Sequence, residues 1–132
     1  MGDQVDRNPI YVYVVDDQKI ITSTLTAILA QNGHSPIGFT NPLEALESAT
    51  VQPPAILIAD VIMPEMNGIE LAIEFNSRFP NCKVLLLSGQ THTTDLLEIA
   101  KERGHDFAVF AKPIHPRELL AAIGRLITES QP

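Results

Sequence analysis

The sequence predicts an α/β protein of the flavodoxin-like (βα)5 class, doubly wound around a five-stranded parallel sheet in the order 2-1-3-4-5. Five short apolar runs lack the alternation of half-exposed strands, which is typical of parallel strands covered on both faces. Each run precedes a longer segment with the periodicity of an amphipathic helix. Because right-handed crossovers leave few topologies for five β–α units, we expect this strand order.

The first half of the chain contains three of these strands. They are expected at Ile10–Val15, Ile37–Phe39 and Ala55–Ala59. Between the first two runs, one helix face is expected to carry Ile21, Leu25, Ile28 and Leu29. Gly33 suits the end of that helix. Asn41 is expected to cap the second helix, with Pro42 at its first position.

The second half continues the pattern with three helices and two strands. The strands are expected at Lys83–Leu87 and Phe107–Ala111. The helices are expected from Ile69 to about Phe79, up to Gly104, and from Pro116 onward. Glu65 and Asn67 are expected in an exposed loop. We divide the chain into a polar N-terminal segment (1–9), one domain (10–128) and a frayed C-terminal tail (129–132).

Composition excludes several classes of function. The chain has 132 residues, a formal net charge of −7 and a pI near 4.9. This charge argues against direct nucleic-acid binding and against docking on anionic lipid. No apolar stretch reaches membrane-spanning length. Cys82 is the single cysteine, which excludes an intrachain disulfide, and we expect it to act as a small hydrophobic residue near a strand end. We expect a cytoplasmic protein.

Polar residues follow four of the predicted strands. Asp16 and Asp17 follow the first run, Asp60 the third, Ser88 the fourth and Lys112 the fifth. In an open α/β sheet these ends share one edge, where ligands bind. Three converging carboxylates repel one another unless one is protonated or a cation joins them. Oxygen ligands favour Mg²⁺, and a lysine and a hydroxyl beside it suit a phosphoryl group.

These motifs, in this order, resemble the receiver domain of two-component response regulators. The resemblance runs from about Tyr11 to Ile127 and rests on Asp16-Asp17, Asp60–Gly68, Ser88-Gly89 and Lys112-Pro113. It implies that Asp60 is the phosphoacceptor. Asp60 would take a phosphoryl group from a phosphohistidine of a sensor histidine kinase or phosphotransfer protein, in a reaction that depends on Mg²⁺.

The resemblance also implies roles for the surrounding residues. Mg²⁺ would be held directly by Asp17, by Asp60 and by the backbone carbonyl of Ile62, and through water by Asp16. Lys112 would pair with the phosphoryl group, and Pro113 would follow a cis peptide bond. The domain would phosphorylate itself from a donor and dephosphorylate slowly, without turning over an external substrate.

The resemblance implies a conformational switch whose readout departs from the usual pattern. Ser88 would move toward the phosphoryl group and change the surface of the fourth helix and fifth strand. Receivers usually carry Tyr or Phe three residues before the lysine, where this chain has Val109. Alternation places the neighbouring Phe110 on the other face. Either Val109 leaves a smaller space beside Ser88, or the strand is shifted by one residue.

Three further positions bear on regulation. Ile62 stands where receivers often carry a polar side chain, so Gln90 is the alternative residue for holding a hydrolytic water. His115 stands where an acidic helix cap is common. Ile20 and Ile114 border the expected site and are candidate contacts for the kinase.

The partners follow from the same resemblance. They are the kinase or phosphotransfer protein and a downstream protein or an output domain outside this chain. A dimer through the fourth helix, fifth strand and fifth helix is a further possibility. The chain is expected to hold no output domain, and a stand-alone protein and a part of a longer regulator remain open.

Alternative readings remain for both function and residues. The chain would be a degenerate receiver that only docks partners, or a Mg²⁺-dependent phosphohydrolase. The docking-only reading is disfavoured because the site residues are intact, namely the acidic pair, Asp60, Ser88 and Lys112. The phosphohydrolase reading is disfavoured because such enzymes need a second acid two residues after the nucleophile, where this chain has Ile62. Asp16 alone suits a helix cap. Surface or capping roles are expected for His34, His92, His105 and His115.

Overall fold

The computed structural model describes residues 10–89 and 94–130 and forms one five-stranded parallel sheet. The strand order β2-β1-β3-β4-β5 is the predicted one. The sheet consists of β1 (Tyr11–Val15), β2 (Ser35–Phe39), β3 (Ile56–Asp60), β4 (Lys83–Ser88) and β5 (Ala108–Ala111). The β2 strand begins two residues earlier than expected. Pro36 is tolerated there because β2 is an edge strand.

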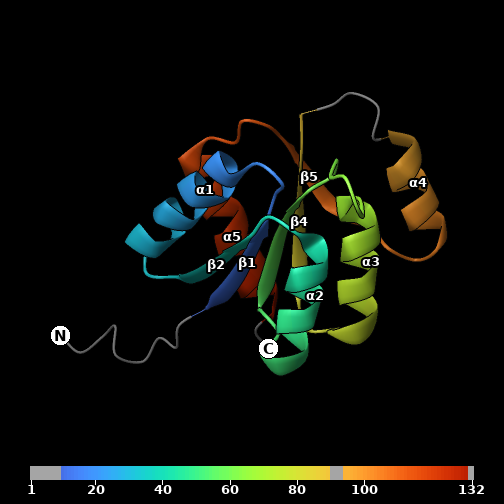
Figure 1. Cartoon of the computed structure of the whole chain (residues 1–132), viewed down its shortest axis with the longest axis horizontal. Coiled ribbons are helices and arrows are strands. Elements are labelled where there is room, and N and C mark those ends of the chain that lie inside the picture. The colour runs from blue at the N-terminus through green and yellow to red at the C-terminus, as the bar shows by residue number, and fades with distance from the viewer. Residues whose placement is uncertain (1–9, 90–93, 131–132) are drawn as a thin grey trace.

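Helices cover both faces of this sheet (Figure 1). The bounds are α1 (Lys19–Gln31), α2 (Pro42–Val51), α3 (Gly68–Arg78), α4 (Thr94–Glu102) and α5 (Pro116–Ser130). One face carries α1 and α5, and the other carries α2 and α3, with α4 beside α3. The α5 helix includes the first two residues of the segment that we assigned to the tail. Residues 131–132 lie outside the described residues.

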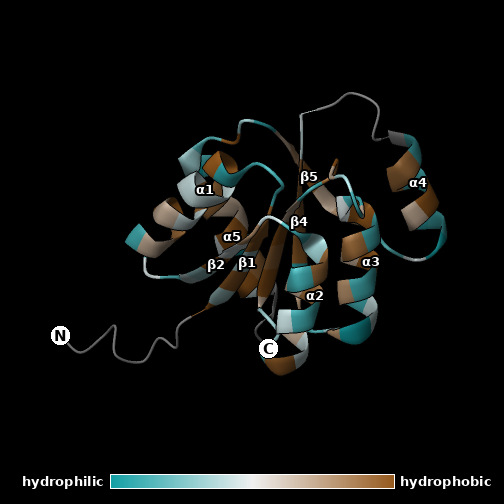
Figure 2. Ribbon diagram, viewed as in Figure 1, coloured by the Kyte–Doolittle hydropathy of each residue, from teal (hydrophilic) through white to brown (hydrophobic). Residues whose placement is uncertain are grey.

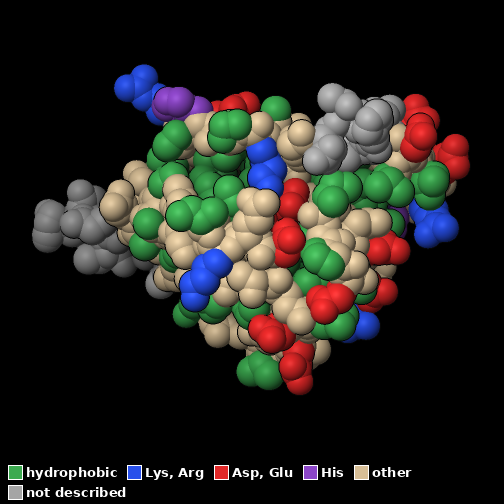
Figure 3. All heavy atoms as spheres, turned by 45° about the horizontal axis from the view of Figure 1, so that its top comes forward, with side chains coloured by type: hydrophobic (Ala, Val, Ile, Leu, Met, Phe, Trp, Pro, Cys, Tyr) green, Lys and Arg blue, Asp and Glu red, His purple; other side chains and the backbone are tan. Residues whose placement is uncertain are grey.

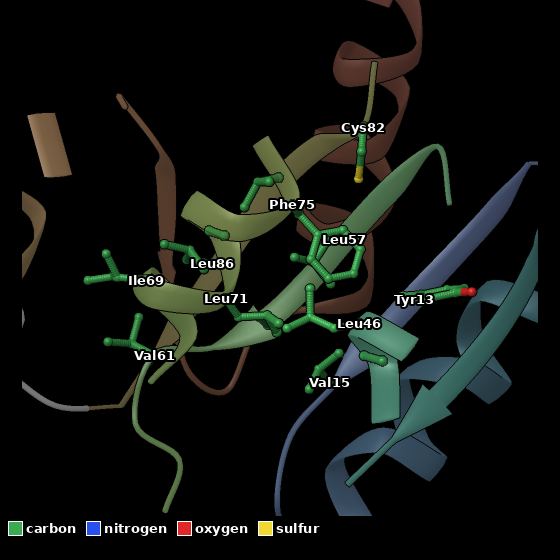
Figure 4. Packing of buried hydrophobic residues seen from close by; sticks show 14 of the residues in the cluster. Tyr13, Val15, Leu46, Leu57, Val61, Ile69, Leu71, Phe75, Cys82 and Leu86 are labelled. Carbon is green, nitrogen blue, oxygen red and sulfur yellow. The ribbon is translucent and has the colours of Figure 1, made fainter. Parts of the chain in front are cut away.

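Two aliphatic clusters hold the helices on the sheet. The larger one packs α2 and α3 against the sheet around Leu57 and Phe75, which are fully buried (Figure 4). The other packs α1 and α5 against the sheet around Leu29 and Ile123. Figure 2 shows the corresponding pattern, with hydrophobic strands and helices that are hydrophilic on one side. Cys82 is buried in the first cluster, and burial raises the pKa of its thiol to about 12.

The start of α3 differs from the expected exposed loop at Asn67. This partly buried residue is the N-cap of α3. Its side chain accepts a hydrogen bond from the Glu70 N–H (2.8 Å), and its own N–H donates to the Glu70 carboxylate (3.1 Å). The two hydrogen bonds form a capping box, which satisfies two otherwise unpaired donors. Asn followed three residues later by Glu is a sequence signal for this motif.

Gly68, the first residue of α3, lies directly against the backbone of Asp60. Its N–H donates to the Val61 carbonyl at 2.8 Å. A Cβ atom at this position would collide with the Asp60 carbonyl oxygen and come within 2.8 Å of the carbonyl carbon. The glycine therefore allows the helix to begin beside the end of β3, which fixes the position of Asp60.

Replacing Gly68 by alanine is expected to destabilise the fold by about 1–3 kcal/mol, because rigid backbone rather than a flexible side chain must move. Urea unfolding followed by circular dichroism measures the change. The matched control is Gly124→Ala in α5, where no atom lies within 4 Å of the added Cβ. That variant should gain roughly 0.5–1 kcal/mol from better helix propensity. Equal stability of Gly68→Ala and the parent would contradict the close contact of Gly68 with the Asp60 backbone.

Candidate functional site

The carboxyl ends of four strands place polar side chains at one edge of the sheet. Asp16 directly follows β1, Asp60 ends β3, Ser88 ends β4 and Lys112 directly follows β5. These ends lie at the top of the view in Figure 1. Figure 3 turns this edge forward and shows acidic side chains beside a basic one near the middle of the face. The structure thus brings the predicted residues to one edge.

Three carboxylates form a compact cluster there. One oxygen from each of Asp16, Asp17 and Asp60 lies within 4.8 Å of the others. Asp16 is 1% exposed and Asp60 is 7% exposed, whereas Asp17 is exposed to solvent. Buried negative charges this close are costly unless a cation compensates them. The cluster is therefore built to be completed by positive charge.

Lys112 supplies part of that charge. Its Nζ donates to Asp16 Oδ2 at 3.0 Å and lies 3.4 Å from Asp60 Oδ2. Burial lowers the pKa of Lys112, but the hydrogen bond to Asp16 and the charges of both acids raise it by more, so the net shift of the pKa is upward. The ammonium therefore stays protonated between the two buried carboxylates.

Asp16 has a second role in the local backbone. Its Oδ1 accepts a hydrogen bond from the Gln18 N–H at 2.9 Å. Gln18 is the N-cap of α1 and makes no side-chain capping hydrogen bond. Asp16 thus shapes the turn that enters α1 with one oxygen and holds Lys112 with the other, so its capping role and its site role are compatible.

The cluster suits a hard divalent cation. Asp17 and Asp60 each offer a carboxylate oxygen to the cluster, in which only Asp17 is exposed to solvent. Mg²⁺ binds through one or two carboxylates and keeps several waters, a requirement that a partly exposed acidic cluster meets. The Ile62 side chain is 48% exposed in the loop after β3. The donor set of the described residues therefore fits Mg²⁺.

The surroundings of Asp60 change the pKa of its carboxyl group. Burial raises its pKa, and the charge of Asp16 raises it further, while Lys112 and the Ile62 backbone lower it in part. The net shift of the pKa is upward from the ordinary value of 3.8. In the absence of metal, the ionised form of Asp60 is therefore less favourable in the folded protein than in the unfolded chain.

This shift predicts a pH dependence of stability. Because the pKa of Asp60 is higher in the folded protein than in the unfolded chain, the protonated carboxyl group stabilises the fold at pH values below 3.8. This contribution is lost as the pH rises through the raised pKa of the folded state. Without Mg²⁺, Asp60→Asn should be more stable than the parent near neutral pH. The difference should shrink toward pH 3.8. Urea titrations of both proteins in EDTA across this range provide the test, and a variant that is less stable at neutral pH would contradict it.

The remaining predicted site residues lie around this cluster. Ser88 is buried, and its carbonyl accepts a hydrogen bond from the Lys112 N–H at 3.0 Å. The Lys112–Pro113 peptide bond is cis, as the resemblance implies. Val109 packs in the cluster that holds α2 and α3 on the sheet, and Phe110 packs in the cluster that holds α1 and α5. The two side chains therefore lie on opposite faces, as alternation predicts.

Regulatory positions are only partly described. His115 Nδ1 accepts a hydrogen bond from the Arg117 N–H at 3.0 Å and so replaces the acidic cap that was common at this position. His105 bonds to Asn76 rather than to the site. Ile20, in the first turn of α1, is 72% exposed. The expectations for Gln90 and His92 concern residues outside the described ranges.

Comparison with known proteins decides the family. The family model described as "Response regulator receiver domain" matches residues 12–124, which includes every residue of the acidic cluster as well as Ser88 and Lys112. This chain belongs to the response regulator receiver family. Receiver domains are signalling modules of two-component systems rather than enzymes that turn over an external substrate. The resemblance that the sequence motifs indicated is therefore confirmed.

Individual relatives agree with this assignment. The receiver is 34% identical over 116 residues to the transcriptional regulatory protein CreB of Escherichia coli, covering 88% of this chain and 50% of CreB. It is 32% identical over 116 residues to the chemotaxis protein CheY of Thermotoga maritima, covering 87% of this chain and 95% of that CheY. The chain thus spans about half of CreB and nearly all of this CheY.

A solved structure supports the fold. A CheY-like receiver domain protein from Methanospirillum hungatei matches with a TM-score of 0.84 at 22% identity, over 93% of this chain and 97% of the other. Among the described residues of the receiver, none of the helices has both the length and the apolar character that spanning a membrane requires.

Proposed function

We propose that this receiver domain is a phosphoacceptor switch in which Asp60 takes a phosphoryl group from a histidine kinase or phosphotransfer protein. A carboxylate oxygen of Asp60 attacks the phosphorus of the phosphohistidine. The P–O bond forms as the P–N bond breaks, and the leaving imidazole takes up a proton. The observation that carries the proposal is the position of Asp60, buried at the end of β3 within reach of Asp16, Asp17 and Lys112.

The surrounding residues would hold the metal ion and neutralise the phosphoryl group during this transfer. Asp17 and Asp60, with the backbone carbonyl of Ile62, would hold Mg²⁺ directly, and Asp16 would act through a bound water. Bound Mg²⁺ neutralises phosphoryl oxygens. Lys112 would turn from the Asp16 and Asp60 carboxylates to the added oxygens, because it already lies 3.0 Å and 3.4 Å from those carboxylates.

The output is proposed to be a changed surface on α4, β5 and α5. Ser88 ends β4 beside the site, and its hydroxyl would shift toward the phosphoryl group. With Val109 in place of an aromatic residue, no ring swings inward, so the readout would rest on the movement of Ser88 and the packing of α4. Val109 packs in the same cluster as Ala100, Leu96 and Leu97 of α4, which provides that connection.

Partners and location belong to the same proposal. The kinase would approach the exposed site mouth, where Ile20 and Ile114 offer apolar contacts. A downstream protein or an output domain would read the α4-β5-α5 surface, which is also the surface of a proposed dimer. The domain would act in the cytoplasm, where histidine kinases present their phosphohistidines.

The direct test is phosphorylation by a small donor. The protein is incubated with Mg²⁺ and acetyl phosphate or phosphoramidate, and the intact mass is recorded over time. The proposal predicts one phosphate-sized adduct that decays slowly after the donor is removed. A protein that acquires no adduct from several donors would be a receiver that only docks partners. Sustained hydrolysis of unrelated phosphate esters would favour the phosphohydrolase alternative.

A further inference from the structure

A cavity lies at the ends of β4 and β5 opposite to those that form the phosphoryl site. It has a volume of about 390 Å³ and is lined by residues of α3, β4, β5, α5 and the segment that enters β5. Small-molecule sites in proteins occupy about 300–1,000 Å³. Ser88 and Lys112 lie at the other ends of these two strands, so the cavity shares no lining residue with the acidic cluster.

The cavity exists because β5 is shorter than β4. The pairing of the two strands begins at Leu85 and Ala108, so Val84 has no registered partner in β5. The Lys83 N–H donates to the Ala55 carbonyl on the side of β3. Because backbone groups of successive residues point to opposite sides of a strand, the Val84 N–H faces the side where β5 is missing. The cavity is thus bordered by an open strand edge.

The charges that line the cavity favour an anion. Lys83 from β4 and Arg125 from α5 supply two cations, against one carboxylate from Asp106. Within the described residues, neither cation forms a salt bridge. A chain with a net charge of −7 therefore carries a locally positive opening here. Cations that line one cavity can recognise a carboxylate through charge-assisted hydrogen bonds.

Apart from Asn76, the rest of the lining is apolar. Phe107 and Phe110 contribute partly buried rings, and Ala122 and Leu126 add aliphatic surface from α5. Phe107 stacks on the His105 ring with centroids 5.8 Å apart. His105 Nδ1 lies within hydrogen-bond distance (3.0 Å) of the Asn76 side-chain amide of α3. These contacts hold the Phe107 ring before any ligand enters, which lowers the ordering cost of binding.

We propose that this cavity binds a small organic carboxylate with an aromatic or aliphatic body. Its carboxylate would pair with Lys83 and Arg125, and its body would lie at the start of β5, between Phe107 on one face of the sheet and Phe110 on the other. The site would be independent of phosphorylation at Asp60. A bound ligand would contact the segment between α4 and β5, which leads directly to Val109.

Benzoate is a suitable probe, with neutral benzamide as its matched control. Amide spectra of ¹⁵N-labelled protein are recorded during a titration with each compound. Benzoate is expected to shift the resonances of Val84, Phe107 and Ala108 in a saturable way. Benzamide is expected to bind at least about tenfold more weakly, because it lacks the charge that the two cations recognise.

Charge-removing variants separate this site from other anion sites. The double variant Lys83→Gln and Arg125→Gln should raise the benzoate dissociation constant at least about tenfold. Arg103→Gln, an exposed cation outside the lining, should leave it unchanged. Equal binding of benzoate and benzamide, unchanged affinity in the double variant, or shifts confined to Gly89 and Lys112 would each overturn the proposal. Phosphorylation of Asp60 by acetyl phosphate should proceed normally in the double variant.

Discussion

The Asp60→Asn variant is expected to lose the acetyl-phosphate adduct almost completely, to below roughly a hundredth of the parent level. The amide oxygen carries no full negative charge and so cannot act as the nucleophile. Asparagine has nearly the volume of aspartate, so the packing at the end of β3 should be preserved. Intact mass after a fixed incubation with Mg²⁺ and donor measures the loss.

A neighbouring acid provides the control for this variant. Glu65 lies exposed in the loop between β3 and α3, outside the acidic cluster. Glu65→Gln should accept the phosphoryl group at the parental rate. The variant Asp60→Asn should also remain folded by circular dichroism. An adduct of normal size on folded Asp60→Asn would show that another residue is the acceptor.

The Asp17→Asn variant is expected to bind Mg²⁺ at least about tenfold more weakly, because affinity at such sites depends on the number of charged ligands. Asp17 is the solvent-exposed member of the cluster, so its loss should disturb the fold little. Phosphorylation should slow in parallel, and EDTA should stop it in the parent. Isothermal titration calorimetry with Mg²⁺ measures the affinity.

The matched control removes a charge elsewhere. Glu47 is exposed on α2, and Glu47→Gln changes the net charge by the same amount as Asp17→Asn. This control should keep the parental Mg²⁺ affinity, which separates direct ligation from general electrostatics. If Asp17→Asn also kept the parental affinity, Asp17 would not be a ligand, and the metal site would have to be drawn differently.

Local sequence patterns predict much of this fold. Unbroken apolar runs such as Ala55–Ala59 are long enough for strands and too short for helices, so the strands could be predicted. Their order could be predicted because right-handed crossovers leave few topologies. The first and last residues of each strand were harder to predict. The apolar pattern in β2 begins only at Ile37, whereas pairing with β1 extends the strand back to Ser35. Pairing depends on a neighbour that is distant in sequence.

The candidate site shows the same division. Residue types and their positions after strands predicted that Asp16, Asp60 and Lys112 would meet, because parallel strands end at one edge. The collision that any Cβ at Gly68 would make with Asp60 depends on coordinates and has no local signal. The salt bridge that joins Lys112 to Asp16 in the described structure was also not predicted. In contrast, the Asn67 cap had a readable signal in its spacing to Glu70.

The most direct measurement of the central claim is the chemical position of the phosphoryl group. The protein is phosphorylated with acetyl phosphate and Mg²⁺ and treated with borohydride, which reduces an aspartyl phosphate to homoserine, and its peptides are sequenced by mass spectrometry. Phosphorylation of Asp60 predicts homoserine at position 60 and unchanged aspartate at positions 16 and 17. Homoserine at either of those two positions, or a stable phosphate on Ser88, would contradict it.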